Sequence, residues 1–185
     1  MDIYSLVKFL HIASAIVWIG AGVGLVILGV AADRKSDREG FVRILQNVGF
    51  LAPRVFVPAS LATLVLGIIA AWMNWGFVQL WVILGLVGFA ATFLTGNFLL
   101  GPRAAKTEKI VAAEGASDHA VALGRELLTI AKFDYVMLFM VVADMVFKPA
   151  PGDFGVLAVM AIIIAGAAIA FLIPVFRAPR VAVAA

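Results

Sequence analysis

The residues best suited to chemistry lie near the start of the chain, where Lys8 and His11 stand three positions apart in an apolar stretch. Lys8, His11, Ala15, Trp18 and Gly22 follow the spacing of one face of a helix. Inside a membrane an imidazole needs a hydrogen bond, a metal or a charged partner, because an unsatisfied polar group in hydrocarbon costs several kcal/mol. His11 is therefore a candidate functional residue.

A single histidine at membrane depth restricts the metals that it could serve. Zinc sites take three or four protein ligands, and the chain has no cysteine. Copper could use thioethers, but Met145 turns away from the helix face shared by Met137 and Met140. Haem b needs only one protein ligand and suits an apolar helical bundle. We therefore expect one haem b on His11, with Lys8 and Trp18 as further cofactor-binding residues and Lys8 serving the propionates.

The elements that must position these residues are membrane spans. Of the 185 residues, 64% are hydrophobic and 14% charged, whereas soluble domains have about 25% charged residues. Apolar runs of about 20 residues, enough to cross a bilayer, occur at 4–31, 53–73, 77–101, 127–147 and 154–176. We expect an all-α, polytopic bundle of five transmembrane helices that forms a single membrane domain over residues 1–185.

The basic residues predict the orientation of the bundle, since short cytoplasmic loops accumulate Lys and Arg. Eleven of the 14 fall on one side of the predicted spans: Arg34, Lys35, Arg38, Arg43, Arg54, Arg103, Lys106, Lys109, Arg125, Arg177 and Arg180. We expect the N-terminus outside and the C-terminus in the cytoplasm of a bacterial inner membrane. Cations that border apolar spans favour anionic lipid headgroups as partners and do not indicate nucleic-acid binding.

The connections and span ends also carry local signals. Residues 36–39 fit a capping box for a short helix in the inner interface, and Ser117 is a candidate N-cap for the helix that enters the fourth span. Pro58 should kink the second span, and His119 should be exposed. A predicted aromatic belt marks the outer boundary and comprises Trp72, Trp75, Phe77 and Trp81.

Buried charges suggest two ion pairs. Lys8 and Asp144 lie at similar depth near the outer end, where they could pair beside His11; the alternative is that Lys8 extends to the outer headgroups. Towards the cytoplasm, Arg54 could pair with Asp134, since an unpaired carboxylate in an apolar interior is costly. Both pairs would be structural.

Two segments carry a family resemblance: Lys8-Phe9-Leu10-His11 followed by Trp18-Ile19-Gly20-Ala21-Gly22, and Asp144-Met145-Val146-Phe147-Lys148-Pro149. The first resembles the opening helix of the CopD-like membrane proteins, a group that includes the HemJ-type protoporphyrinogen oxidases. The second resembles an uncharacterised bacterial branch of predicted integral membrane proteins. The resemblance implies haem b or copper chemistry, with His11 as the one residue that maps to the family's ligand. No residue matches the lysine that the HemJ-type enzymes use, so an oxidase activity is not carried over.

The sequence thus favours an integral membrane protein that binds one haem b and has a redox or haem-handling role. One alternative is a non-enzymatic accessory subunit of a larger membrane complex or homo-oligomer, in which His11 only makes a hydrogen bond. A weaker alternative is a copper or small-solute carrier.

Overall fold

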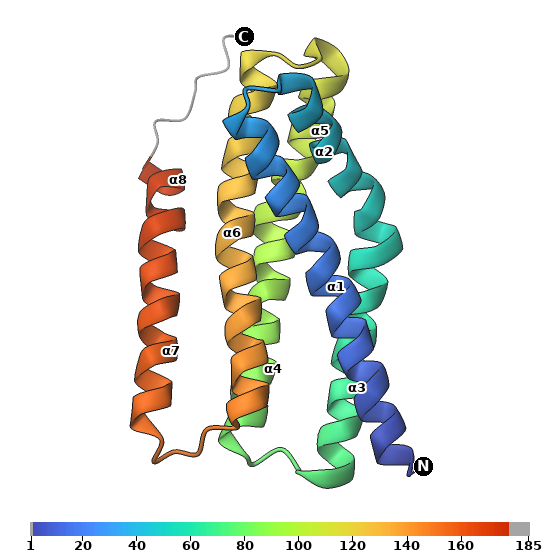
Figure 1. The fold of residues 1–185 in the computed structure, drawn as a ribbon, viewed down its shortest axis with the longest axis vertical. Coiled ribbons are helices and arrows are strands. Elements are labelled where there is room, and N and C mark those ends of the chain that lie inside the picture. The colour runs from blue at the N-terminus through green and yellow to red at the C-terminus, as the bar shows by residue number, and fades with distance from the viewer. Residues whose placement is uncertain (1, 178–185) are drawn as a thin grey trace.

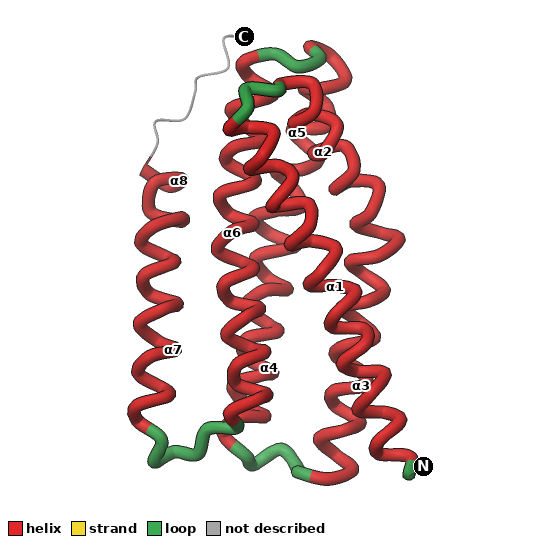
Figure 2. Tube along the Cα trace, in the orientation of Figure 1, coloured by secondary structure: helices red, strands yellow, loops and turns green. Residues whose placement is uncertain are grey.

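The computed structural model describes residues 2–177, which form helices joined by short turns (Figures 1 and 2). The α-helices are α1 (Ile3–Arg34), α2 (Arg38–Leu51), α3 (Val57–Asn74), α4 (Leu80–Leu94), α5 (Gly101–Glu114), α6 (Asp118–Phe147), α7 (Phe154–Ala167) and α8 (Ile173–Arg177). Three π-helical segments, η1 (Ala52–Phe56), η2 (Thr95–Leu100) and η3 (Ala168–Leu172), continue α2 into α3, α4 into α5 and α7 into α8. The all-α prediction is confirmed. Arg180 lies outside the described residues.

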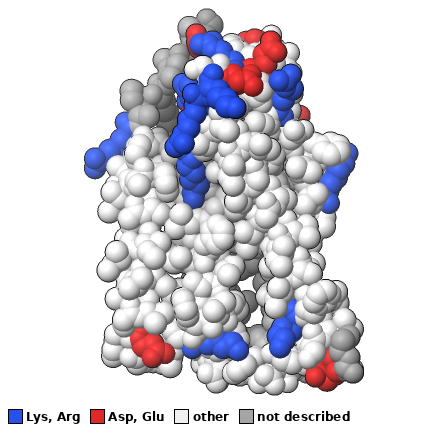
Figure 3. Space-filling model, in the orientation of Figure 1, with Lys and Arg blue, Asp and Glu red and all other residues white. Residues whose placement is uncertain are grey.

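Four continuous helices are long and apolar enough to cross a membrane: Ile3–Arg34, Arg38–Asn74, Leu80–Glu114 and Phe154–Arg177. α6 has a similar length, but its apolar stretch carries Lys132, Asp134 and Asp144, so the fourth predicted span, 127–147, is not among the four. Figure 3 shows a broad uncharged band between two charged ends, as expected for a surface that lies in hydrocarbon.

The helix caps confirm one expectation and correct another. Ser117 is the N-cap of α6, and its hydroxyl accepts the Ala120 N–H at 3.1 Å. The cap of α2 is Asp37, which accepts the Gly40 N–H at 2.9 Å, whereas Ser36 lies in the preceding turn with a φ of 57°. η1 continues α2 into α3 without a break, so the predicted interfacial helix is instead the first part of the 38–74 helix.

Each π-helical segment ends two residues before a proline. Pro58 follows η1, Pro102 follows η2 and Pro174 follows η3. Proline has no N–H to bond the carbonyl four residues earlier, and its ring clashes with that carbonyl. Widening the turn to an i→i+5 bond, such as the Val57 N–H to the Ala52 carbonyl, relieves the clash. The kink that Pro58 predicts therefore takes the form of a π-helical turn.

The helices pack as two groups. α1 packs along α3, while α6 packs along α4 and also contacts α5, α7 and parts of α1 and α2. α3 does not pack against α4 or α6. One close approach between the groups is at Gly22 of α1, where any side chain would overlap the ring of Tyr135 on α6. Helices can approach this closely only at small residues.

The most tightly buried core lies at one end of the bundle, where α1, α2, α5 and α6 meet around Phe41 and Ala120. Ion pairs tie the same end together: Arg38 to Asp118 at 2.6 Å, Arg103 to Glu126 at 2.6 Å, and Arg125 to Asp33 at 2.7 Å. Most basic residues visible in Figure 3 gather at this end.

His119 and Glu114 lie at this end too. His119 is half-buried rather than exposed, and its Nδ1 lies 3.4 Å from Oε1 of Glu114. A hydrogen bond from the Ser117 hydroxyl, with a smaller contribution from His119, lowers the pKa of Glu114. These contacts secure the turn between α5 and α6.

The opposite end carries the predicted aromatic belt. The rings of Trp75 and Trp81 meet edge to face with centroids 5.4 Å apart, and the Trp75 indole N–H donates to the Tyr4 hydroxyl at 3.1 Å. Lys148 caps α6 in the left-handed conformation and places its ammonium 3.9 Å from the Trp75 ring centre. This cluster joins α1, α3, α4 and α6 at their ends.

Candidate functional site

The predicted ligand His11 lies between α1 and α3. Its Nδ1 is 2.7 Å from the backbone carbonyl oxygen of Thr63, and the Thr63 hydroxyl donates to the Ala59 carbonyl at 2.8 Å. The ring rests on Gly67: a Cβ there would lie 2.8 Å from the His11 Cε1. The missing side chain at Gly67 therefore allows the imidazole to reach the backbone of α3.

This contact fixes the tautomer of His11. A carbonyl oxygen can only accept, so Nδ1 carries the proton and donates it. In the neutral imidazole, Nε2 is then the nitrogen with an available lone pair. Nε2 has no hydrogen-bond partner within residues 2–177, and it is not among the fully enclosed atoms. A fixed Nδ1–H with a free Nε2 is the arrangement that a metal-ligating histidine requires.

The two other predicted cofactor residues do not surround His11. Trp18 lies two helical turns further along the same face of α1, about 10 Å away, and packs against Phe89 of α4 with ring centroids 5.7 Å apart. Lys8 is exposed one turn in the other direction, with its ammonium 5.2 Å from the centre of the Tyr4 ring. Only a group of extended shape could contact all three.

The predicted ion pair between Lys8 and Asp144 is not formed. Both carboxylate oxygens of Asp144 lack a hydrogen-bond partner within the described residues. Asp144 lies on α6, is 1% exposed and faces Gly85 of α4. The reason is the angle between the helices: α1 meets α6 near Gly22 and diverges from it towards the N-terminus, as Figure 1 shows. Similar depth in the membrane did not imply proximity.

The predicted pair between Arg54 and Asp134 is also absent. Arg54 is exposed, donates to the Phe50 carbonyl at 3.0 Å and stacks on the Phe50 ring at 4.1 Å. Asp134 instead faces a cavity, with one carboxylate oxygen unpartnered. The guanidinium therefore bonds to its own helix and not to a carboxylate of α6.

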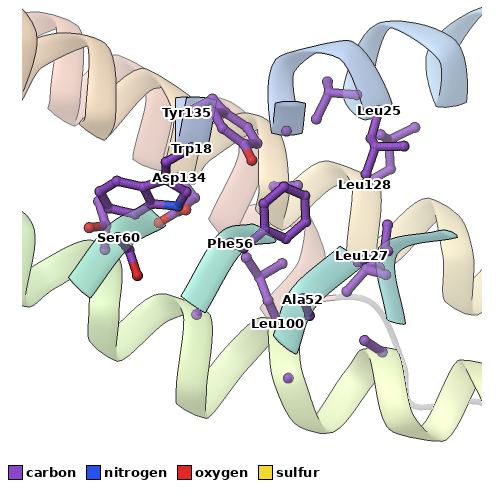
Figure 4. A pocket seen from close by; sticks show the side chains of 18 of the residues that line it. Trp18, Leu25, Ala52, Phe56, Ser60, Leu100, Leu127, Leu128, Asp134 and Tyr135 are labelled. Atoms are coloured by element: carbon purple, nitrogen blue, oxygen red, sulfur yellow. The ribbon is translucent and has the colours of Figure 1, made fainter. Parts of the chain in front are cut away.

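Sequence reasoning missed this cavity, which has a volume of about 510 Å³ and is lined by α1, α2, η1, α3, α4, η2, α5 and α6 (Figure 4). Trp18, Phe56, Phe89, Asp134 and Tyr135 are among its lining residues. It also missed Thr63 and Gly67 as partners of His11. The one signal available was the presence of small residues at Gly22 and Gly67, which predict close helix approach without saying what approaches.

Within residues 2–177, no three His, Cys, Asp or Glu side chains gather in a way that could hold a metal ion. A haem iron needs only one such ligand, which His11 can provide.

No curated protein and no solved structure matches the chain. One family model does match, over residues 5–149, which extend from the first turn of α1 to just past the end of α6. Its description agrees with the four apolar helices and the uncharged band of the surface. The chain therefore belongs to the family described as predicted integral membrane protein (DUF2269).

Proposed function

We propose that this membrane protein binds one haem b through Nε2 of His11. The observation that carries the proposal is the 2.7 Å hydrogen bond from Nδ1–H to the Thr63 carbonyl, because it orients the ring and leaves Nε2 free. If His11 served only to join α1 to α3, its Nδ1–H would make the same hydrogen bond to Thr63, but Nε2 would have no role.

The surroundings of His11 are compatible with haem. The ring lies at a half-buried position on the face of α1 that continues to Trp18, and its neighbours on α3 are Thr63 and Gly67. The ammonium of Lys8 makes no ion pair within the described residues and is available to a propionate. Haem bound there would supply one-electron transfer, and the chain's own part would be to hold, orient and partly shield it.

The resemblance of the first helix to CopD-like and HemJ-type proteins supports a redox or haem-handling role in a bacterial inner membrane. The lack of a residue matching the HemJ lysine speaks against the same oxidase reaction. We further propose that α6 is a fifth span, since it runs the length of the bundle beside α4 (Figure 1). We also propose that the N-terminus lies outside, since the opposite end of the bundle carries most of the basic residues (Figure 3).

Absorption spectroscopy tests the haem proposal directly. The protein would be expressed with a haem precursor in the medium, purified in detergent and examined for a Soret band and for iron. We expect a band in the wild type that is lost in His11→Ala and retained in His119→Ala, which removes the other histidine at the far end of the bundle. A colourless wild type, or an equal band in His11→Ala, would overturn the proposal.

A further inference from the structure

The cavity of about 510 Å³ is a second candidate site, separate from His11, which is not among its lining residues. Its volume is in the range of about 300–1,000 Å³ that is usual for small-molecule sites. Its walls are mostly apolar, and it opens to the lipid-facing surface, since the lining residues Val57, Leu61 and Phe93 are about half exposed. A ligand could therefore enter from the membrane.

One acidic side chain faces this cavity without a partner. Asp134 is 7% exposed, and its Oδ1 makes no hydrogen bond within the described residues. The lining contains no Lys, Arg or His from any of the surrounding helices; Tyr135 is its only other titratable side chain. A carboxyl group in such a place either holds a proton or takes a cation as partner, because a bare carboxylate in an apolar interior is costly.

Aromatic rings complete the chemistry of the cavity. Trp18 of α1 and Phe56 of η1 line it together with Asp134 (Figure 4), and Phe89 of α4 is a further lining residue. Aromatic faces attract cations within about 6 Å, more strongly where water is excluded. Anionic ligands find no positive side chain in this lining. The walls thus favour an apolar molecule with one positive charge.

The backbone around the cavity is also specialised. Two of the three π-helical segments contribute lining residues: Ala52 and Phe56 from η1, and Gly96, Asn97 and Leu100 from η2. π-Helical turns occur frequently at functional sites. Here they widen the helices that face Asp134, whereas η3 lies outside the cavity.

We propose that this cavity binds lipophilic organic cations, with Asp134 as the counter-ion and the aromatic rings as the walls. When a cation enters, the O–H bond of the Asp134 carboxyl breaks, the proton passes to water, and the carboxylate pairs with the cation. One proton is released for each positive charge bound. Binding should therefore strengthen as the pH rises.

The test measures equilibrium binding of tetraphenylphosphonium to the purified full-length protein in detergent. We expect saturable binding to the wild type, tighter at mildly alkaline than at mildly acidic pH. Asp134→Asn should weaken binding by at least about tenfold, a change of about 1.4 kcal/mol. The matched control is Asp144→Asn, which alters the other unpartnered carboxyl of α6 outside the cavity and should bind as the wild type does.

A second variant guards against a folding defect in Asp134→Asn. Gly96 lines the cavity, and a Cβ added there meets no heavy atom within 4 Å, so Gly96→Leu should fold and fill part of the space. We expect it to weaken binding, while His11→Ala should leave binding unchanged and so separates this proposal from the haem proposal. The proposal would be overturned if the wild type showed no saturable binding, or if Asp134→Asn and Gly96→Leu both bound as tightly as the wild type.

Discussion

At the scale of single residues, the membrane region contains polar groups whose roles are set by what they contact. His11 is held by a backbone carbonyl, while Asp134 and Asp144 have carboxylate oxygens without partners. All three drew attention in the sequence because ionisable groups are rare in spans. Their partners were not predictable, because a partner depends on the rotation and tilt of each helix, which hydropathy does not encode.

Gly67 offers a test of the His11 geometry. An alanine methyl at this position would lie 2.8 Å from Cε1 and 3.0 Å from Nδ1 of His11, so the ring must move and its bond to Thr63 must lengthen. We expect Gly67→Ala to reduce the haem-to-protein ratio and to shift the Soret band. Gly20→Ala is the control, since a Cβ at Gly20 meets nothing within 4 Å. Unchanged spectra for Gly67→Ala would show that the carbonyl contact does not orient the ligand.

Asp144 tests the absence of the ion pair with Lys8. Breaking a buried pair by removing one partner costs about 3–5 kcal/mol, whereas removing an unpartnered buried polar group relieves a cost of about 1–3 kcal/mol. We therefore expect Asp144→Ala to keep or raise the thermal midpoint in detergent, and Lys8→Ala to change it little. A large drop in the thermal midpoint of both variants, recovered in a double variant with the two charges exchanged, would instead show that Lys8 and Asp144 form an ion pair.

At the scale of elements, apolar runs and capping residues predicted where helices lie, and Ser117 marked the start of α6 correctly. Pro58 predicted where its helix bends but not how, since either an open kink or an i→i+5 bond can relieve the clash that proline causes. The continuity of α2 with α3 was missed because the polar face of α2 suggested a separate interfacial helix. The cavity was missed because, like the partners of the buried charges, it depends on the rotation and tilt of each helix.

The π-helical turns make a prediction at this scale. Replacing Pro58 or Pro102 by alanine restores an N–H for the carbonyl of Arg54 or Phe98, so η1 or η2 can return to an α-helix. We expect either change to keep or raise the thermal midpoint and to weaken tetraphenylphosphonium binding several-fold, because both segments line the cavity. Pro174→Ala makes the same change at η3, away from the cavity, and should leave binding unaltered. Equal affinities in all three variants would remove the link between these turns and the site.

At the scale of the whole molecule, charge is distributed unevenly between the two ends. The ion pairs and most visible cations lie at the end that carries the α1–α2 and α5–α6 turns, and the aromatic cluster lies at the other (Figures 1 and 3). This asymmetry is the pattern that orients membrane proteins, with the basic end in the cytoplasm. Whether α6 crosses the membrane decides on which side of the membrane the turn between α6 and α7 lies.

Labelling of single cysteines can decide this, because the chain has no cysteine of its own. Ala113, near the end of α5, and Ala150, after α6, are both exposed and are separated by α6 alone. We expect a membrane-impermeant maleimide to label Ala150→Cys in intact cells and Ala113→Cys only after permeabilisation. The charges of Lys132, Asp134 and Asp144 oppose insertion of α6, but its packing against α4 encloses the two carboxylates within protein. Labelling of both positions from one side would mean that α6 does not cross, and labelling in the opposite sense would reverse the orientation.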